Sequence, residues 1–401
     1  MSGIAVLGAT GSIGRSTLAV LGEHPQRFRV TGLAADRDWR ALLEQARRFR
    51  VPRVALADEM AAAELERELR AAGERIEVLA GAQGVVALAA DPDADMVMAA
   101  ISGAAGLAST LAAAAAGKRV LLANKESAVM AGPLLIAAVR RGGATLIPID
   151  SEHNAIFQCL PPTWRAGERV SGVRRLVLTA SGGPFLGWSA EQMQDATPEQ
   201  ACAHPRWRMG RKISVDSATL MNKGLELIEA SVLFGMPAGE IGVVVHPQSI
   251  VHSLVEYADG STLAQLAAPD MRTPIAQALA WPERIRSGVE SLDLVRAGRL
   301  DFEAPDPQRF PCLGLAAAAA REGGLAPASL NAADEVAVQA FLDRQLNFGE
   351  IAAVIEMVMA QVANAKVTDL ESVLAADAEA RARARALLQR RHRPIAGGAT
   401  A

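Results

Sequence analysis

This 401-residue sequence has few cysteines, few aromatic residues and no excess of positive charge. It has three cysteines, Cys159, Cys202 and Cys312, and none of them belongs to a C-x-x-C pair. This pattern argues against a disulfide scaffold and suits a reducing compartment. Aromatic residues make up 4% of the chain and the formal net charge is -3, so we expect no nucleic-acid partner.

Long runs of large apolar residues are also missing. The one uncharged stretch of membrane-spanning length, residues 96–117, is built from Ala, Gly and Ser rather than Leu and Ile. We predict a buried strand, a turn and an Ala-rich helix there, and no membrane partner. The first residues, MSGIAVLGATGSIG, show neither a basic region nor a small-residue cleavage site. We therefore predict a cytoplasmic protein without a signal or transit peptide.

The hydrophobic pattern predicts an α/β protein with several domains. Residues 1–150 alternate short apolar runs with helical segments, which is typical of βαβ units and predicts an N-terminal Rossmann-like parallel sheet. The strands are expected at residues 4–7, 29–33, 54–56, 96–98, 119–122 and 145–149.

The rest of the chain predicts a central α+β catalytic domain at 151–285, a linker at 286–311 and a C-terminal helical bundle at 312–392. Within the central domain, residues 181–211 are rich in Gly, Pro and Trp, and we expect them to form a lid with little regular structure. Further strands are expected at 174–179, 241–245 and 262–266, helices at 221–233, 330–344, 349–362 and 375–389, and a disordered tail at 394–401.

A glycine-rich loop, GATGSIG at residues 8–14, follows the first strand and opens a helix. Such a loop lets the backbone approach a pyrophosphate at a helix N-terminus, although it is also compatible with a tight structural turn. The end of the second strand usually selects the nucleotide. Here Arg37 favours NADP, while Asp36 and Asp38 favour NAD, so this segment leaves the choice open.

Carboxylates follow the last strand of the first domain. Asp150 and Glu152 lie two residues apart, so both side chains can face one pocket and bind Mg²⁺ or Mn²⁺. A helix cap explains the same residues equally well. Asn222 and Glu226 are four residues apart on one helix face, beside Lys223. Ser217, Asn222 and Lys223 could bind a phosphate, and Glu226 could complete a metal site. The same residues are also compatible with a helix whose charged side chains are simply solvated.

Three further features concern the predicted lid and two histidines. The turn at 181–185, SGGPF, exposes the Ser181 hydroxyl and backbone N–H groups, as an anion-binding turn would. Trp207 and Met209 can cover a nicotinamide or a carbon chain, or Trp207 can simply fill the core. His246 and His252 lie in an apolar stretch, and we interpret both as buried core histidines.

Eight motifs together give the sequence its resemblance to a known family. They are GATGSIG, LLANKES, IDSEHNAIFQ, SGGPF, HPRWRMGRKISVDSATLMNKGLELIEA, HPQSIVHS, PDMRTPIAQALAWP and LNAADEVAVQAFL. Read together, they resemble the 1-deoxy-D-xylulose-5-phosphate reductoisomerases. The resemblance implies a homodimer that converts 1-deoxy-D-xylulose 5-phosphate to 2-C-methyl-D-erythritol 4-phosphate with NADPH and Mg²⁺ or Mn²⁺.

The resemblance also implies a role for each matching residue. The cofactor-binding residues would be Thr10, Gly11, Ser12, Ile13, Arg37, Asn124, Glu126 and Gly210. The metal ligands would be Asp150, Glu152 and Glu226. The substrate would be held by Lys125, Ser151, Glu152, Ser181, His204, Trp207, Ser217, Asn222, Lys223 and Glu226, and Lys125, Glu152 and His204 would be catalytic.

The sequence departs from the family pattern at residues 36–38, where a Gly, a basic residue and an Asn are usual. We therefore expect NADPH to be preferred through Arg37, but by a reduced margin. Two other functions remain possible on the same residues. One is an NADP-dependent dehydrogenase of another sugar phosphate, and the other is an NADP-binding redox-sensing regulator without catalysis.

Overall fold

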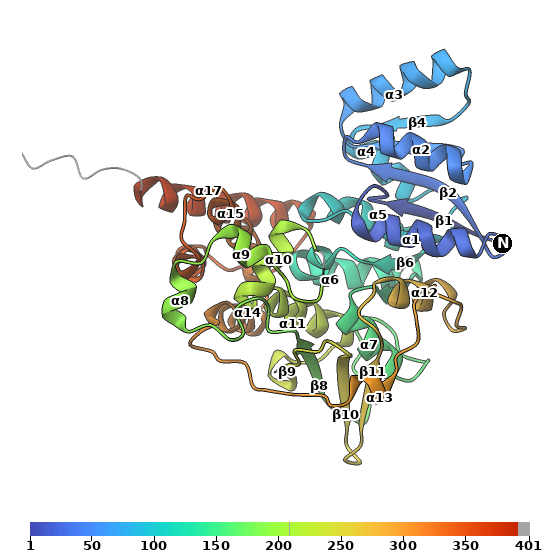
Figure 1. The fold of residues 1–401 in the computed structure, drawn as a ribbon. Coiled ribbons are helices and arrows are strands. Elements are labelled where there is room, and N and C mark those ends of the chain that lie inside the picture. The colour runs from blue at the N-terminus through green and yellow to red at the C-terminus, as the bar shows by residue number, and fades with distance from the viewer. Residues whose placement is uncertain (208, 392–401) are drawn as a thin grey trace, which may run out of the picture.

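The computed structural model describes residues 1–207 and 209–391, and confirms an α/β fold with two sheets and a helical region (Figure 1). The tail for which we predicted disorder lies outside the described residues. Among the described residues, no helix is both long and apolar enough to cross a membrane. Residues 96–117, the uncharged stretch of membrane-spanning length, contain strand β5 (Met96–Ala99), the short 3₁₀ turn η1 (Ala104–Gly106) and helix α5 (Leu107–Ala115).

The N-terminal sheet has seven parallel strands in the order β4-β3-β2-β1-β5-β6-β7. Besides β5, the strands are β1 (Ser2–Leu7), β2 (Phe28–Ala35), β3 (Arg53–Leu56), β4 (Glu77–Ala80), β6 (Arg119–Leu122) and β7 (Thr145–Pro148). Besides α5, the helices are α1 (Ser12–Glu23), α2 (Trp39–Phe49), α3 (Glu59–Ala72), α4 (Gly81–Ala89) and α6 (Lys125–Gly142). The strand order reverses direction beside β1, so the loops after β1 and β5 diverge and open a crevice where ligands bind in such sheets.

The second sheet is mixed, with the order β11-β10-β8-β9. Its strands are β8 (Val173–Ala180), β9 (Ile241–Val245), β10 (Val251–Tyr257) and β11 (Thr262–Leu266). The elements around it are α7 (Ser151–Cys159), α10 (Arg211–Thr219), α11 (Met221–Phe234), η2 (Ala238–Glu240) and α12 (Arg272–Ala280). Strand β8 pairs parallel with β9 and antiparallel with β10, which in turn pairs antiparallel with β11.

The expectation of little regular structure at 181–211 is wrong for residues 190–202. Two short helices form there, α8 (Ala190–Gln194) and α9 (Pro198–Cys202), each begun by a capping box, at Ser189 and Thr197. Phe185 is fully buried, and its ring lies 4.9 Å from that of Phe348 in the C-terminal region. The segment up to the end of α9 therefore packs with the core of the helical region, and the stretch between α9 and α10 is residues 203–210.

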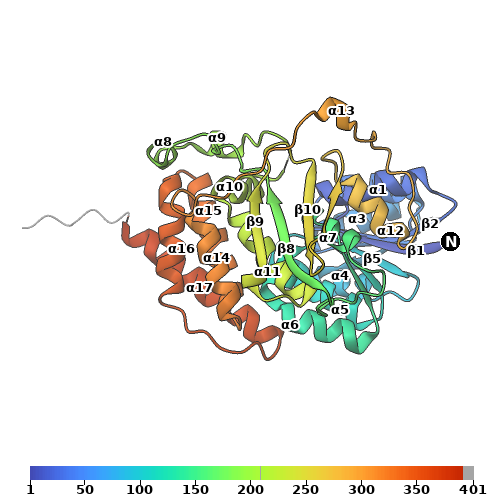
Figure 2. The same ribbon diagram turned by 90° about the horizontal axis from the view of Figure 1, so that it is seen from below.

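The C-terminal helices are α14 (Pro311–Glu322), α15 (Ala326–Leu342), η3 (Phe348–Glu350), α16 (Ile351–Met359) and α17 (Leu370–Arg391). The chain reaches them through the expected linker, which contains one short helix, α13 (Leu294–Ala297), and a bridge between Glu303 and Val245 of β9. At its end the Arg309 guanidinium donates to the carbonyls of Leu186 and Trp188. Figure 2 shows the helical region at one end of the molecule, with α10 and α11 between it and the rest.

Candidate active site

The glycine-rich loop is packed too tightly for side chains at two of its positions. Gly8 has a φ of 79°, and a Cβ built there would lie 2.4 Å from the Ala100 carbonyl oxygen. A Cβ on Gly14 would lie 2.3 Å from the Gly8 carbonyl oxygen. Helix α1 then starts after Gly11 without a side-chain cap, so its first N–H groups are free for an anion. The loop geometry therefore suits a pyrophosphate better than a merely structural turn.

The two aspartates beside Arg37 differ in what they do. Asp38 caps α2, where its carboxylate accepts a hydrogen bond from the Ala41 N–H at 3.2 Å. Asp36 instead pairs with Arg37, with Nε and Oδ2 3.0 Å apart, and both side chains are exposed. Asp36 is thus the residue that competes directly for the guanidinium expected to meet a 2′-phosphate.

Other residues expected on the cofactor side lie around the first turn of α6. Asn124 is buried, caps α6 by accepting from the Ser127 N–H at 2.6 Å, and donates to the Gly103 carbonyl at 3.0 Å. It therefore holds the loop after β5 in place. Glu126 lines a separate cavity that extends toward α15 and α17, and Gly210 borders this cavity as well as the main one. Thr10 and Gly11 lie in the loop before α1 but do not line the main cavity.

Three carboxylates meet at the end of β7, although they come from two distant segments. Asp150, Glu152 and Glu226 each offer one oxygen, and these oxygens lie within 4.8 Å of one another. Asp150 is also the N-cap of α7, because it accepts from the Glu152 N–H at 3.3 Å. The cap and the metal-ligand interpretations are therefore compatible, since a carboxylate has two oxygens. Glu226 comes from α11 and is buried, so it does not belong to a solvated helix face.

Two lysines neutralise part of this charge. Lys125 Nζ lies 2.9 Å from Asp150 Oδ2 and 3.1 Å from Glu226 Oε1. Lys223 Nζ lies 2.8 Å from Glu152 Oε1 and also contacts Glu226. Burial and the nearby Glu226 raise the pKa of Glu152 to about 7, as expected where buried carboxylates lie close together.

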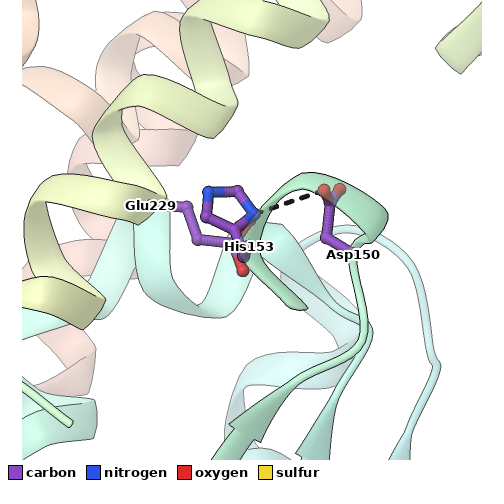
Figure 3. A group of neighbouring side chains, drawn as sticks. All are labelled: Asp150, His153 and Glu229. Carbon is purple, nitrogen blue, oxygen red and sulfur yellow. Dashed lines mark ion pairs between the residues drawn. The ribbon is translucent and has the colours of Figure 1, made fainter. Parts of the chain in front are cut away.

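Behind the carboxylates lies His153, fully buried between α7 and α11 (Figure 3). Its Nδ1 is 3.2 Å from Asp150 Oδ1 and 3.4 Å from Glu229 Oε2, and its Nε2 is 2.8 Å from the Glu226 carbonyl oxygen. Burial alone would lower the pKa of His153, but Glu229 and Asp150 raise it to about 9. The imidazolium therefore orients Asp150 from the side away from the cavity.

The corner that we expected to bind an anion, the anion-binding corner, lies where the 181–183 turn meets α10. Gly183 has a φ of 68°, and a Cβ there would lie 2.6 Å from the Ser217 carbonyl oxygen, so the turn packs directly on α10. Leu220 joins α10 to α11 with a φ of 59°, a conformation that costs a non-glycine residue roughly 1–2 kcal/mol. This bend brings Ser217 and Asn222 to one cavity.

The segment 203–210 carries His204, Trp207 and Met209, all of which line the cavity. His204 Nδ1 accepts from the Trp207 N–H at 2.9 Å, so the proton is on Nε2, which lies 2.8 Å from Ser181 Oγ. Burial lowers the pKa of His204 to about 4, so the ring is neutral near pH 7. Trp207 is part-buried at the cavity rather than in the core, with its ring 6.4 Å from that of His252.

Sequence reasoning missed several residues of the cavity wall. His252 was expected in the core, and it is buried, but it also lines the cavity with Ser249. Pro269, Asp270 and Met271 close another side. Their signal was the motif at 269–282, which contributed to the resemblance without any residue in it being assigned. His246 lies in the core as expected, with its Nδ1 2.7 Å from the Asp301 carbonyl oxygen.

Most of the predicted site residues thus surround one cavity of about 460 Å³. Those that line it are Ser12, Ile13, Lys125, Asp150, Ser151, Glu152, Ser181, His204, Trp207, Met209, Gly210, Ser217, Asn222, Lys223 and Glu226. A dinucleotide loop, a carboxylate cluster and an anion-binding corner meet there. The fold and the cavity are those of a dinucleotide-dependent oxidoreductase.

Comparison with known proteins identifies the family within this class. Residues 4–132 match the family described as 1-deoxy-D-xylulose 5-phosphate reductoisomerase, and residues 146–234 match its C-terminal domain. Residues 266–383 match the DXP reductoisomerase C-terminal domain. The chain belongs to the 1-deoxy-D-xylulose 5-phosphate reductoisomerase family.

Individual relatives are similar over nearly their whole length. The chain is 59% identical over 382 residues to the reductoisomerase of Methylococcus capsulatus, covering 95% of this chain and 97% of that one. It is 57% identical over 391 residues to that of Pseudomonas fluorescens, covering 97% and 98%. A structure from Zymomonas mobilis in complex with NADPH has a TM-score of 0.89 at 49% identity, covering 97% and 99%. A DOX-P reductoisomerase structure with NADPH, fosmidomycin and magnesium has a TM-score of 0.91 at 48% identity, covering 97% and 98%.

Proposed function

We propose that this cavity converts 1-deoxy-D-xylulose 5-phosphate to 2-C-methyl-D-erythritol 4-phosphate while oxidising NADPH, in the presence of Mg²⁺ or Mn²⁺. The observation that carries the proposal is the meeting of Asp150, Glu152 and Glu226 in a cavity that also includes Ser12 of the nucleotide loop and Ser217 of the anion-binding corner. Relatives with this activity in their names match nearly the whole chain, and solved relatives contain NADPH and magnesium.

A hard divalent cation fits the carboxylate cluster. All three donors are carboxylate oxygens, which Mg²⁺ and Mn²⁺ prefer, and burial together with Glu226 raises the pKa of Glu152 to about 7, a cost that a bound cation would relieve. Asp150, Glu152 and Glu226 would hold the cation, and His153 would fix the orientation of Asp150. When bound, such a cation polarises the substrate carbonyl and stabilises negative charge on its oxygens.

Lys125 is suited to stabilising charge rather than removing a proton. Burial would lower its pKa, but Asp150, Glu226 and Glu229 raise it well above the ordinary value, so the ammonium stays protonated. It would donate to the oxygens of the carbonyl and hydroxyl end of the substrate, beside Ser151 and Glu152. Between Lys125 and Glu152, Glu152 is the better proton acceptor.

The anion-binding corner would hold the phosphate. Ser181 and Ser217 offer neutral hydrogen-bond donors. Asn222 Nδ2 donates to Glu226 and its Oδ1 accepts from Lys125 Nζ at 2.9 Å, so Asn222, like the Lys223 ammonium, would reach the phosphate from the carboxylate side. His204 holds its Nε2–H against Ser181 Oγ, 2.8 Å away, so it would contact the substrate together with that hydroxyl. Trp207 and Met209 would cover the reacting carbons and exclude water, which protects the intermediate aldehyde before hydride transfer.

The direct test is to mix the protein with 1-deoxy-D-xylulose 5-phosphate, Mg²⁺ or Mn²⁺ and NADPH, and to follow the absorbance of the reduced cofactor. We expect steady oxidation that stops when a chelator is added and returns with excess metal. Oxidation that continues in chelator would favour a metal-independent sugar-phosphate dehydrogenase. An absence of oxidation under all these conditions would contradict the proposal and favour a binding protein.

We predict that NADPH is preferred over NADH through Arg37, by a margin that Asp36 narrows. Replacing Asp36 with glycine removes a carboxylate 3.0 Å from Arg37, and should raise the ratio of kcat/KM for NADPH to that for NADH roughly fivefold. Asp38→Asn is the matched control, because an asparagine keeps the α2 cap, and it should change the ratio less. A parent enzyme that uses NADH as well as NADPH would contradict the assignment of Arg37.

We also infer a cytoplasmic homodimer. Strand β11 lies at the edge of its sheet with Leu263 48% exposed, and the linker exposes Leu294 and Val295 by 60% and 92%. Exposed edges and apolar side chains of this kind are commonly covered by a second subunit. The three cysteines are free, which suits a reducing compartment. Light scattering should return twice the chain mass.

A further inference from the structure

We propose that Lys212 is a positioning residue that clamps α10 to the C-terminal helices, and so holds both the end of the lid and the phosphate-binding Ser217 in place. The inference rests on the proposed function, which supplies the substrate. Its geometry comes from the contacts of Lys212 with Asp216 and Asp334. Lys212 is the second residue of α10, directly after the stretch 203–210 that connects α9 to α10.

The clamp is an ion pair between two parts of the molecule that are distant in sequence. Lys212 Nζ lies 2.7 Å from Asp216 Oδ2, one turn further along α10, and 2.8 Å from Asp334 Oδ2 on α15. The Asp216 and Asp334 side chains are 2% and 0% exposed. Within the described ranges, no other cationic group lies at ion-pair distance from either carboxylate. Asp334 therefore depends on Lys212 for its charge to be balanced.

The position of α10 decides where two functional groups lie. Ser217 follows Asp216 directly, and its carbonyl oxygen is the atom against which Gly183 packs. The N-terminal end of α10 is Gly210 and Arg211, where the lid stretch ends. At the other end, Leu220 fixes the bend into α11, which carries the carboxylate Glu226. A tilt of α10 would therefore move Ser217 and the lid, while Glu226 is held in the carboxylate cluster by Lys125 and Lys223.

The charges of the cluster predict which variants matter. Two buried carboxylates share one ammonium, and burial together with Asp334 raises the pKa of Asp216 well above its ordinary value. The pKa of Lys212 is raised as well, because Asp216 and Asp334 outweigh the effect of burial. Among the described residues, Asp334 is the ion-pair partner of Lys212 outside α10, so an Asp334→Asn change should also loosen the clamp. Loss of the ammonium leaves two buried carboxylates without a counter-charge, which is strongly unfavourable.

The test compares Lys212→Met with Asp334→Asn and with Glu199→Gln. Glu199 on α9 forms an ion pair with Arg344 in which both side chains are more than half exposed, so it is a matched control with a solvent-screened pair. In Lys212→Met we expect KM for 1-deoxy-D-xylulose 5-phosphate to rise about tenfold or more, with a smaller change in KM for NADPH. Asp334→Asn removes the charge on α15 that holds Lys212, so it should raise the same KM in the same direction, whereas Glu199→Gln should stay within about twofold of the parent.

A second readout does not depend on turnover. Trypsin cleavage after Arg206, identified by mass spectrometry in the free protein, should be several-fold faster in Lys212→Met, because the lid has lost one of its anchors. If Lys212→Met does not fold, Lys212→Gln keeps an amide donor and takes its place in both assays. A lower melting temperature with unchanged KM and an unchanged cleavage rate would overturn the proposal, because the cluster would then serve stability alone. If the parent does not turn over the substrate, the proposed function is wrong. The cleavage rates would still test whether Lys212 holds α10 in place.

Discussion

Replacing Glu226 with glutamine should lower the rate of NADPH oxidation roughly a hundredfold or more. Glu226 is the residue that connects α11 to the carboxylates at the end of β7, and it contacts both Lys125 and Lys223. Glutamine has the same shape but carries no charge, so the cluster loses one of its three anionic donors while the helix packing is kept. The cation should bind more weakly, and the substrate carbonyl should be less polarised.

The measurement that isolates this effect is a titration with Mn²⁺ at saturating substrate. The concentration of Mn²⁺ that gives half-maximal activity should rise at least about tenfold in the variant, while KM for NADPH stays close to that of the parent. Circular dichroism and the melting temperature would show whether the variant is folded. A folded variant with the parent's metal requirement and rate would contradict the assignment of Glu226 as a ligand.

Much of the fold follows from local sequence. The runs at 119–122 and 145–149 match β6 and β7 closely, because strands buried in a parallel sheet need continuous apolar residues. Strand β4 was not predicted from the sequence. It lies at the sheet edge, where all of its residues are exposed or half-buried, so it lacks a continuous apolar run. Strand β10 was missed because polar residues such as His252 and Ser253 interrupt its pattern. In both cases the strand is set by pairing with its neighbours rather than by its own residues.

The site was harder to predict than the fold, because its parts are joined only by tertiary packing. The pair Asp150 and Glu152 was ambiguous alone, since the sequence does not show that Glu226 packs against it from α11. The expectation of little regular structure at 181–211 was partly wrong for a similar reason. Phe185 looks like part of a loop, but it fills a core made with α15 and η3, which are far away in sequence. The family motifs supplied the long-range information that spacing and periodicity lack.

Replacing Gly183 with alanine should weaken binding of the sugar phosphate more than any other single methyl group added to this site. The new Cβ would lie 2.6 Å from the Ser217 carbonyl oxygen, and the residue would have to keep a φ of 68°. Both effects push the 181–183 turn away from α10 and separate Ser181 from Ser217. We expect KM for 1-deoxy-D-xylulose 5-phosphate to rise about 10- to 100-fold, with a smaller loss in kcat.

Gly187→Ala is the matched control, because a Cβ there would meet no atom within 4 Å and its φ is not positive. It lies four residues along the same segment and should leave KM unchanged within about twofold. Steady-state kinetics with varied sugar phosphate and saturating NADPH would separate the two variants. The dependence of Gly183→Ala on Mn²⁺ should match that of the parent, because the carboxylate cluster lies on other elements. Equal KM values for the two variants would show that the contact between the 181–183 turn and α10 does not form the phosphate site.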